Sequence, residues 1–594
     1  MKKFNLMMVM LLASLTLAAA SMKPKVPTDG QKNVSVNAQI VVQGPSSIAL
    51  AKDSCLLNGE HISVASVAAS MAIFRPGLMD FATDYTLEVP DGAFTLKDGT
   101  PLEGCKVHFT TASPEAKVFD AIVAADGSGD YTSIRAAVKA APANRVEPWI
   151  IFVKNGEYEE LVRTASNQTY ISLVGEDPEK TILKFSITSN GGHERDQANF
   201  TEAEGRGPVL VASAPNFYLH NITVINSWGY EKQNGPQALA LGSYTDRFAM
   251  FNTRLLSYQD TWQTGSDEHR HYARRCYIEG AVDFIYCSGD MVLDSCTLGL
   301  CRNGTVIVAP SHGAGVKYGY VFRDTKIVSS KPGTARTNNT YGRPWHNYPR
   351  TSFINTTWSK DITFSAGGWI DHMGGLPMVF AEYNTRNYLG QPVDLSKRNT
   401  YYYKGDKSNP EGTCTAQAVL SKEEADALTV RTVLSGSDAW TPDRMTVELP
   451  APELTYQGNT LSCNKIAAAI CYLVMKDGEF YKVTTDTSMD VEGDVNAYTV
   501  RAVNYYGTMG LISKAPFVNG IQAEKVADLD ALFDGQALRL GRFEGVATVE
   551  MLSLDGRLLS KQQVSSEAVL PLAAQVAMSR ITAPQGTLVV KCIR

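Results

Sequence analysis

The stretch FAMFNTRL, residues 248–255, decides the fold, because similar stretches precede and follow it in the chain. They read FYLHNITV (217–224), HYARRCYI (271–278), MVLDSCTL (291–298) and YVFRDTKI (320–327), with SFINTTW (352–358) as a weaker copy. Aligned on Leu219, Met250, Ala273, Leu293 and Phe322, successive copies lie 31, 23, 20 and 29 residues apart. One recurring strand with variable spacing is typical of a solenoid, in which each coil adds a strand and insertions leave as loops.

These repeats predict an all-β protein whose central part is a right-handed parallel β-helix. The alternative is a sandwich of antiparallel strands, which is weaker because the copies recur without hairpin turns between them. Cys276 and Cys296 occupy the same position in successive copies. Since stacked strands lie about 4.8 Å apart, these two residues are expected to form either a disulfide or a cysteine ladder.

Small β-sandwich domains are expected on both sides of the β-helix. Before it, short runs with turn signals such as VPDGAF and LKDGTPLEG resemble bacterial Ig-like modules. After it, short strands return in a fibronectin type III-like segment and then in a segment that resembles C-terminal sorting domains. The expected organisation is a signal peptide (1–22), an Ig-like domain (23–113), the β-helix (114–445), a fibronectin type III-like domain (446–515) and a C-terminal β-sandwich (516–594).

The N-terminus has the pattern of a secretory signal peptide. Lys2 and Lys3 precede an apolar run from Leu6 to Leu17, and small residues follow at 18–20. An uncleaved anchor is the alternative interpretation. No later run is long and apolar enough to cross a bilayer. We therefore expect an exported protein that does not span the membrane and is periplasmic, on the cell surface or secreted.

The composition is that of an ordinary soluble protein, with 44% hydrophobic residues, 20% charged residues and a net charge of −6 over 594 residues. No basic footprint for nucleic acid is present, and a monomer is expected. His269 and His271 lack further ligands nearby, so we interpret them as a polar strand face rather than a zinc site. Export would make the ten cysteines potential disulfide partners. Local possibilities are Cys55 with Cys105 and Cys463 with Cys471.

Two aspartates stand out within the repeats. Asp260 and Asp283 are separated by 23 residues, the same offset as between Met250 and Ala273. They are therefore expected at equivalent positions of adjacent coils, with their side chains next to each other. Neighbouring carboxylates differ in proton affinity, so one can act as a base or nucleophile and the other as an acid. The alternative is that each aspartate only satisfies backbone groups at a coil turn.

Four further residues favour the catalytic interpretation. Gln237 and Gln259 could donate amide N–H groups to a developing oxyanion. Arg343 could keep one carboxylate ionised and oriented, and Trp345 offers a flat face for a sugar ring. Taken singly, each has a structural alternative: a ladder glutamine, a surface ion pair or a core tryptophan.

The motifs GEYEE (156–160), QALAL (237–241), YQDTW (258–262), GAVDFIY (280–286) and YGRPW (341–345) occur in the order of the pectin methylesterase motifs. DGSGDYTSI, AGGW (366–369), AEY (381–383) and EEADALTVRTVLSG resemble the opening and closing segments of that family. The chain thus resembles pectin methylesterases over about residues 115–445.

The resemblance implies a role for each candidate residue. Asp283 would attack the methyl ester carbonyl of a galacturonate unit in methyl-esterified homogalacturonan, and Asp260 would serve as the acid and then the base. Gln237 and Gln259 would hold the oxyanion, and Arg343 would bind Asp283. The residues expected to contact the sugar are Trp345, Trp262 and Tyr286. No metal or organic cofactor is implied.

Two positions depart from the family pattern. Trp262 replaces the usual leucine, which suggests a bulky aromatic near the cleft. Cys287 stands where a glycine is expected, which could reshape the turn beyond the nucleophile.

The alternative functions are a pectate lyase or polygalacturonase on the same scaffold, an esterase acting on another ester, and a non-catalytic polysaccharide-binding surface protein. A lyase would gather acidic residues around calcium, and a hydrolase would space two carboxylates around a water molecule. Neither enzyme explains the two glutamines beside the aspartates as well as ester hydrolysis does. The intact catalytic set argues against the non-catalytic alternative.

Overall fold

The computed structural model describes residues 20–190 and 207–514, and beyond them 517–518, 531–533, 537–541, 545–553, 557–565, 568–571, 578–584 and 586–591. Residues 1–19 of the predicted signal peptide lie outside the described residues. Among the helices that are described, none combines the length and the apolar character that a membrane crossing requires.

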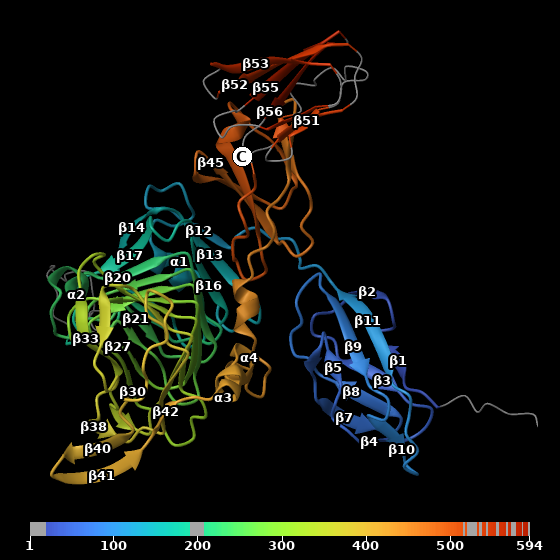
Figure 1. Ribbon diagram of the computed structural model, residues 1–594. Coiled ribbons are helices and arrows are strands. Elements are labelled where there is room, and N and C mark those ends of the chain that lie inside the picture. The colour runs from blue at the N-terminus through green and yellow to red at the C-terminus, as the bar shows by residue number, and fades with distance from the viewer. Residues whose placement is uncertain are drawn as a thin grey trace, which may run out of the picture. The chain divides into compact units, whose positions relative to one another are not determined.

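Three parallel sheets form the central part of the chain (Figure 1). The first sheet has 11 strands: β12 (Ala121–Val123), β13 (Trp149–Val153), β16 (Ile171–Gly175), β19 (Tyr218–His220), β22 (Phe248–Phe251), β25 (Arg270–Arg274), β28 (Asp290–Asp294), β31 (Tyr320–Arg323), β35 (Arg350–Ile354), β39 (Val379–Tyr383) and β42 (Gln417–Val419). The second has eight: β14 (Gly156–Glu159), β17 (Thr181–Phe185), β20 (Thr223–Asn226), β23 (Arg254–Leu256), β26 (Tyr277–Gly280), β29 (Thr297–Leu300), β32 (Lys326–Ser329) and β36 (Thr357–Trp358). The third also has eight: β15 (Val162–Arg163), β18 (Leu210–Ala212), β21 (Leu241–Ser243), β24 (Trp262–Gln263), β27 (Val282–Cys287), β30 (Val306–Pro310), β33 (Arg336–Gly342) and β37 (Ile362–Phe364).

The chain visits these sheets in turn, so each circuit is one coil of a right-handed parallel β-helix, as the repeats predict. The residues on which the repeats align are direct partners in the first sheet, where Leu219 pairs with Met250, Met250 with Ala273, and Ala273 with Leu293. Leu293 pairs in turn with Phe322. Their side chains are fully buried in one continuous apolar core, which explains why this position stays apolar in every copy.

A column of left-handed residues turns the chain from the first sheet to the second. It consists of Asn221, Asn252, Arg275, Ser295, Asp324, Asn355 and Asn384, with φ between 48° and 55°. Asparagine tolerates this conformation better than most residues. The amide of Asn252 donates to Asn221 Oδ1 (2.6 Å), and Asn384 donates to Asn355 Oδ1 (2.8 Å). The turns are thereby bonded from coil to coil.

After Asn221, which is followed by Ile222, every residue of this column is followed by a threonine or a cysteine. Thr253 Oγ1 donates to the carbonyl of Leu219 (3.4 Å), and Cys296 Sγ donates to the carbonyl of Ala273 (3.4 Å). Cys276 and Cys296 are buried free thiols, and the Cys276 N–H donates to Cys296 Sγ (3.4 Å). Of the two predicted alternatives, the structure has the cysteine ladder.

Nine cysteines lie among the described residues and all are free thiols. The predicted bond between Cys55 and Cys105 is absent, because β9 (Asp84–Val89) lies between them: Cys105 pairs with Val89, while Leu56, next to Cys55, pairs with Glu88. Two strand spacings, about 10 Å, exceed the reach of a disulfide. The other predicted local pair, Cys463 and Cys471, is also unbonded.

The helix α1 (Ile134–Ala140) lies at the first coil, and Glu160 of the GEYEE motif binds its N-terminus. Glu160 Oε1 accepts from the backbone N–H of Ile134 (2.7 Å), and Oε2 accepts from the Ser133 hydroxyl (2.6 Å). A carboxylate there satisfies otherwise unpaired N–H groups and complements the helix dipole. This motif therefore has a structural task.

Two short helices, α3 (Lys422–Ala427) and α4 (Val430–Leu434), pack on the outer face of the first sheet. Ser421 and Glu424 form a capping box at the start of α3. Arg323 of β31 donates to the carbonyls of Ala425 and Leu428. This tail covers a sheet other than the one that carries the aspartates.

Residues 20–112 form mainly antiparallel strands around a separate apolar cluster, with one parallel pair between β2 and β11. One sheet has the order β1-β3-β8-β7 and another β2-β11-β9-β5-β6. Their bounds are β1 (Lys23–Val26), β2 (Gln31–Val34), β3 (Ile40–Gln43), β5 (Leu56–Leu57), β6 (Glu60–His61), β7 (Val64–Ala68), β8 (Met71–Phe74), β9 (Asp84–Val89) and β11 (Cys105–Thr111).

The chain divides into two compact units. One consists of Met1–Pro452, Lys465–Asp486 and Thr499–Ile512, and the other of Glu453–Asn464, Thr487–Tyr498 and Ser513–Arg594. Within the first unit, β45 (Cys471–Lys476) and β48 (Tyr498–Val503) contribute Leu473 and Val503 to an apolar cluster with Phe152 of β13.

Candidate active site

Asp260 and Asp283 lie on adjacent coils at the edge of the third sheet, as their spacing predicts. Asp260 lies two residues before β24, Asp283 is the second residue of β27, and these two strands pair. The backbone N–H of Asp260 donates to the carbonyl of Val282 (3.0 Å). Both aspartates have left-handed backbones, with φ of 63° and 49°. The regular strand is therefore interrupted at both positions.

Arg343 binds Asp283 through two parallel hydrogen bonds. Its Nε donates to Asp283 Oδ1 (2.8 Å), and Nη2 donates to Asp283 Oδ2. Arg343 follows β33, which lies two coils beyond β27 in the third sheet. The Asp283 side chain is only 12% exposed, so the fork orients a largely dehydrated carboxylate.

The two carboxyl groups differ in proton affinity. Burial raises the pKa of Asp260 to about 8, with a further contribution from the charge of Asp283 and an opposing one from Arg343. Burial also raises the pKa of Asp283, but the hydrogen bonds and charge of Arg343 act against it. At neutral pH this arrangement favours a protonated Asp260 beside an ionised Asp283.

Gln237 and Gln259 come from loops on neighbouring coils. Gln237 is exposed, Gln259 is half-buried, and the Ala238 N–H donates to the Gln259 carbonyl (3.2 Å). Ser257 Oγ also donates to the Ala238 carbonyl (2.5 Å). Neither glutamine amide donates a hydrogen bond to another described residue. Both side chains are therefore available to a ligand at the edge that carries Asp260.

Tyr286 and Trp345 form an aromatic corner, and Tyr286 is close enough to Asp260 for the charge of the carboxylate to act on it. Their ring centroids lie 5.6 Å apart with the planes at 68°, and Leu239 and Ala309 complete a small apolar cluster. Burial and the charge of Asp260 raise the pKa of Tyr286, so its hydroxyl stays protonated. The predicted placement of Tyr286 and Trp345 beside the aspartates agrees with this geometry.

Trp262 does not lie where we expected it. Its side chain is fully buried in the core of the β-helix, and its Nε1 donates to Ser243 Oγ (2.9 Å). In the register of the third sheet, Trp262 pairs with the inward-facing residues Leu241 and Ile285. A buried indole cannot stack on a sugar, so the replacement of leucine by tryptophan is a change within the core.

Cys287 keeps the turn that a glycine would make. Its φ is 97°, in a region that favours glycine, and Gly289 two residues later has the same value. The turn beyond Asp283 is therefore retained, and the cysteine side chain lines a neighbouring hollow.

Tyr244 and Gln263 belong to the same outer face, although no motif drew attention to them. Tyr244 Oη donates to Gln263 Oε1 (2.6 Å), and Gln263 pairs with Tyr286 on the next coil. Once Trp262 is known to face the core, strand alternation places the next residue, Gln263, on the outer face. Tyr244 lies beyond the end of β21 and had no such signal.

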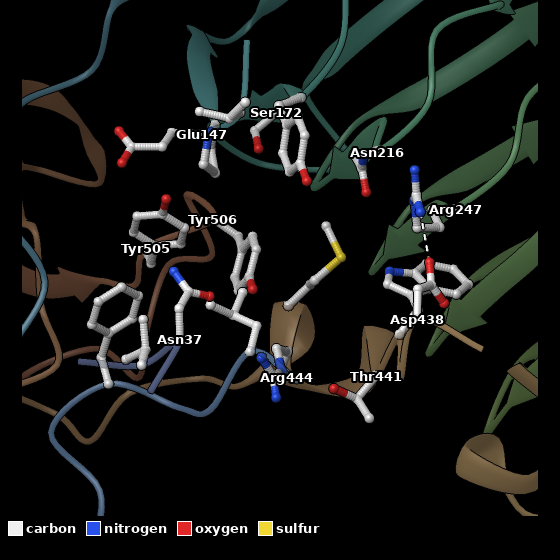
Figure 2. A pocket seen from close by; sticks show the side chains of 18 of the residues that line it. Asn37, Glu147, Ser172, Asn216, Arg247, Asp438, Thr441, Arg444, Tyr505 and Tyr506 are labelled. Carbon is white, nitrogen blue, oxygen red and sulfur yellow. Dashed lines mark hydrogen bonds and ion pairs between the residues drawn. The ribbon is translucent and has the colours of Figure 1, made fainter. Parts of the chain in front are cut away.

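A hollow of about 580 Å³ lies away from the aspartates (Figure 2). Its wall includes Ser172, Asn216 and Arg247 near strands of the first sheet, and Asp438 from the segment after α4. Arg247 Nη1 donates to Asp438 Oδ2 (2.6 Å) across one side of it (Figure 2). None of the predicted site residues lines this hollow.

The histidine pair has structural partners. His271 is buried and its Nε2 lies 3.0 Å from the carbonyl oxygen of Ser243, while His269 Nδ1 accepts from the Ser266 N–H (3.1 Å). Across the residues that the structure describes, no group of three or more histidine, cysteine, aspartate or glutamate side chains is placed to hold a metal ion.

Comparison with known proteins agrees with this geometry. A family model described as Pectinesterase matches residues 120–432. A pectinesterase of Petunia integrifolia is 31% identical over 323 residues, which is 51% of this chain and 80% of that protein. A probable pectinesterase/pectinesterase inhibitor of Arabidopsis thaliana is 29% identical over 53% of this chain, which spans about half of its length (48%).

Solved structures with a similar fold include two pectin methylesterases. The enzyme from carrot has a TM-score of 0.44 at 24% identity, over 56% of this chain and 98% of its own. PemA from Erwinia chrysanthemi has a TM-score of 0.41 at 22% identity, over 55% and 99% of the two chains.

Proposed function

This chain belongs to the pectinesterase family, and from that premise we propose that it hydrolyses methyl esters of pectin, releasing methanol and leaving free carboxylates. The observation that carries the proposal is the pair of unlike carboxyl groups, with Asp283 held by Arg343 and Asp260 kept protonated beside it. Together they provide a nucleophile and an acid on adjacent coils.

In the first step, a carboxylate oxygen of Asp283 attacks the ester carbonyl carbon of a galacturonate unit. The carbonyl oxygen gains negative charge, and the amides of Gln237 and Gln259 are the donors proposed to stabilise it. As the bond to the methoxy oxygen breaks, Asp260 gives its proton to that oxygen and methanol leaves. The product of this step is an anhydride between Asp283 and the substrate.

In the second step, the now ionised Asp260 removes a proton from a water molecule, whose oxygen attacks the acyl-enzyme. Collapse of the second oxyanion releases the galacturonate carboxyl and restores the Asp283 carboxylate and the Asp260 proton. Arg343 holds Asp283 in place in both steps, and the Tyr286–Trp345 corner is proposed to contact the sugar. Asp260 carries the proton in both steps and Asp283 provides the nucleophile, so the proposed route uses no metal.

The test is methanol release from highly methyl-esterified pectin by the purified chain in the presence of EDTA. We expect release from the wild type, at least a thousandfold less from Asp283→Ala, and no change in Asp426→Asn, an exposed aspartate on α3. Circular dichroism would show that Asp283→Ala is folded. A folded wild type that releases no methanol would refute the proposal.

The same proposal extends to location, because pectin is an extracellular polymer. We propose that the N-terminal signal peptide directs export and is removed, with its end somewhat before the predicted residue 22, because Met22 is buried and its N–H donates to the Glu103 carbonyl (2.9 Å). Mass spectrometry of the protein from its native host would then show a mature N-terminus at or shortly before residue 22, and an intact Met1 would contradict export by cleavage.

A further inference from the structure

A hollow of about 570 Å³ lies next to the aromatic corner formed by Tyr286 and Trp345. Its wall is made by Tyr244, Gln263, Cys287 and Ser288 together with the loop 264–269. Gln263 lies three residues after Asp260, and Cys287 directly follows Tyr286. The hollow therefore begins where the aromatic corner beside Asp260 ends.

The floor of the hollow follows one outward-facing row of the third sheet. In that row Gly242 pairs with Gln263, Gln263 with Tyr286, and Tyr286 with Ala309. A Cβ added at Gly242 would lie 2.7 Å from the Tyr244 ring, so the glycine allows this ring to lie against the sheet. An aromatic ring next to an amide is a suitable surface for a sugar.

The rim of the hollow carries two carboxylates. Asp267 Oδ1 accepts from the Gly313 N–H (3.0 Å) and from the Ser288 hydroxyl, while Glu268 Oε2 accepts from the Ser266 hydroxyl (3.3 Å). Within the described part of the chain, neither of them forms an ion pair.

No cation from the same loop neutralises this rim. Burial lowers the pKa of His269, so its ring is uncharged at neutral pH. Arg270 is bound to Asp246 (2.7 Å) and to Asp438 (2.6 Å). Asp283 differs, because Arg343 binds it. The region around Asp283 therefore contains a cation, whereas the rim of the hollow is anionic.

We propose that this hollow binds a methyl-esterified galacturonate unit next to the unit being hydrolysed, and that Asp267 and Glu268 select against a free galacturonate there. An esterified unit is uncharged and can lie against Tyr244 and Gln263. A free unit brings a carboxylate next to two others and is repelled. The inference rests on the proposed function and adds the neighbour requirement of its substrate.

The test compares two hexagalacturonates, one fully methyl-esterified and one with a single internal ester between free units. For each, kcat/KM for methanol release is measured in the wild type, in Glu268→Gln and in Glu268→Lys. The control is Glu423→Lys, which makes the same charge change on the exposed first turn of α3. Thermal unfolding verifies that all variants are folded.

We expect the wild type to prefer the fully esterified hexamer. Glu268→Lys should lower this preference about threefold or more by raising kcat/KM on the singly esterified hexamer, and Glu268→Gln should act less strongly in the same direction. The preference of the wild type should also shrink as salt is added.

An unchanged preference in Glu268→Lys, or an equal change in Glu423→Lys, would overturn the inference while leaving the esterase activity standing. A folded wild type that releases methanol from neither hexamer would refute the proposed function itself.

Discussion

Asp260 and Asp283 are the same residue type on neighbouring coils, yet their surroundings separate their chemistry. Both are withdrawn from water, which disfavours the charged form of each. Only Asp283 receives the two hydrogen bonds of Arg343. Asp260 lacks these bonds and lies next to the negative charge of Asp283, so burial and this charge raise its pKa to about 8. In the proposed reaction, the guanidinium thus decides which aspartate is the nucleophile.

The first prediction concerns the alkaline side of the pH–rate profile. Because Asp260 must be protonated to release methanol, kcat/KM should fall as pH rises through about 8. In Asp283→Asn the neighbouring charge is removed, so the pKa of Asp260 should fall, which carboxyl NMR of the inactive variant can measure. If kcat/KM stays constant up to pH 10, Asp260 is not the acid that protonates methanol.

The second prediction uses stability instead of turnover. Folding raises the pKa of Asp260 from 3.8 to about 8, so the favourable contribution of this carboxyl group to stability is present below pH 4 and is lost as pH rises towards 8. The variant Asp260→Asn has no carboxyl group at this position and so does not lose this stability as pH rises. Its free energy of unfolding should exceed that of the wild type by a margin that grows from pH 4 to pH 8.

Urea denaturation at several pH values measures this margin. The matched variant Asp426→Asn, on the exposed face of α3, should show no such trend. A margin for Asp260→Asn that is constant with pH would contradict a raised pKa.

The third prediction concerns the strained turn after the nucleophile. Since Cys287 has a φ of 97°, Cys287→Gly should increase the free energy of unfolding by about 1 kcal/mol or more. Cys287→Ala removes the sulfur but keeps the Cβ and should show no gain, which separates backbone strain from the loss of the thiol. Equal effects of the two variants would show that the turn is not strained.

At the scale of the elements, the coils are joined by repeated turns as well as by strands. Asn252 has a left-handed backbone and donates to Asn221 on the preceding coil. Its neighbours along the column, Arg275 and Ser295, keep the conformation without an asparagine side chain. The column is therefore imposed by the coil geometry, and asparagine makes it less costly.

The fourth prediction follows from that column. Asn252→Ala should lower the free energy of unfolding by about 1–2 kcal/mol, because it loses the ladder bond and places a Cβ residue at positive φ without compensation. Asn252→Gly loses the bond but tolerates the conformation, so its loss should be smaller. Thermal or urea unfolding compares them, and a larger loss for glycine would show that the backbone conformation contributes little.

At the scale of the whole molecule, the compact unit that contains the β-helix also includes segments that follow the last coil in the chain. Residues 465–486 and 499–512 belong to the same compact unit as the coils. Within that unit the Tyr218 hydroxyl lies 2.6 Å from Thr508 Oγ1, and Asn504 Nδ2 donates to the carbonyl of Met445 (3.3 Å). The predicted boundary at 445/446 remains a prediction, but apolar contacts of the unit continue beyond it.

The fifth prediction tests this with two truncations. A chain that ends after Ile512 keeps the apolar cluster of Leu473, Val503 and Met509 against Phe152 and should release methanol at the rate of the full chain. A chain that ends after Met445 exposes this surface and should unfold at lower temperature. Equal melting temperatures for the two would show that the later segments do not support the β-helix.

The candidate site could be predicted to the extent that its signals are local or periodic. The 23-residue offset placed Asp260 and Asp283 on adjacent coils, and ordered motifs identified the glutamines, Arg343 and the aromatic corner. Trp262 was placed wrongly, because a motif says which residue occurs but not which way it faces. Its register with Leu241 and Ile285 shows that it faces the core.

The sequence by itself determined the β-helix, because each copy must bury the same apolar position against the copy before it, and that demand recurs in the chain as a pattern. It also gave the proposed catalytic set, since those residue types together serve ester hydrolysis. Only the tertiary structure decided that Trp262 faces the core, that Cys287 keeps a glycine turn, and that Tyr244 and Glu268 line one hollow. These depend on the direction of single side chains and on the conformation of single loops, which do not recur from coil to coil and so leave no periodic signal in the chain.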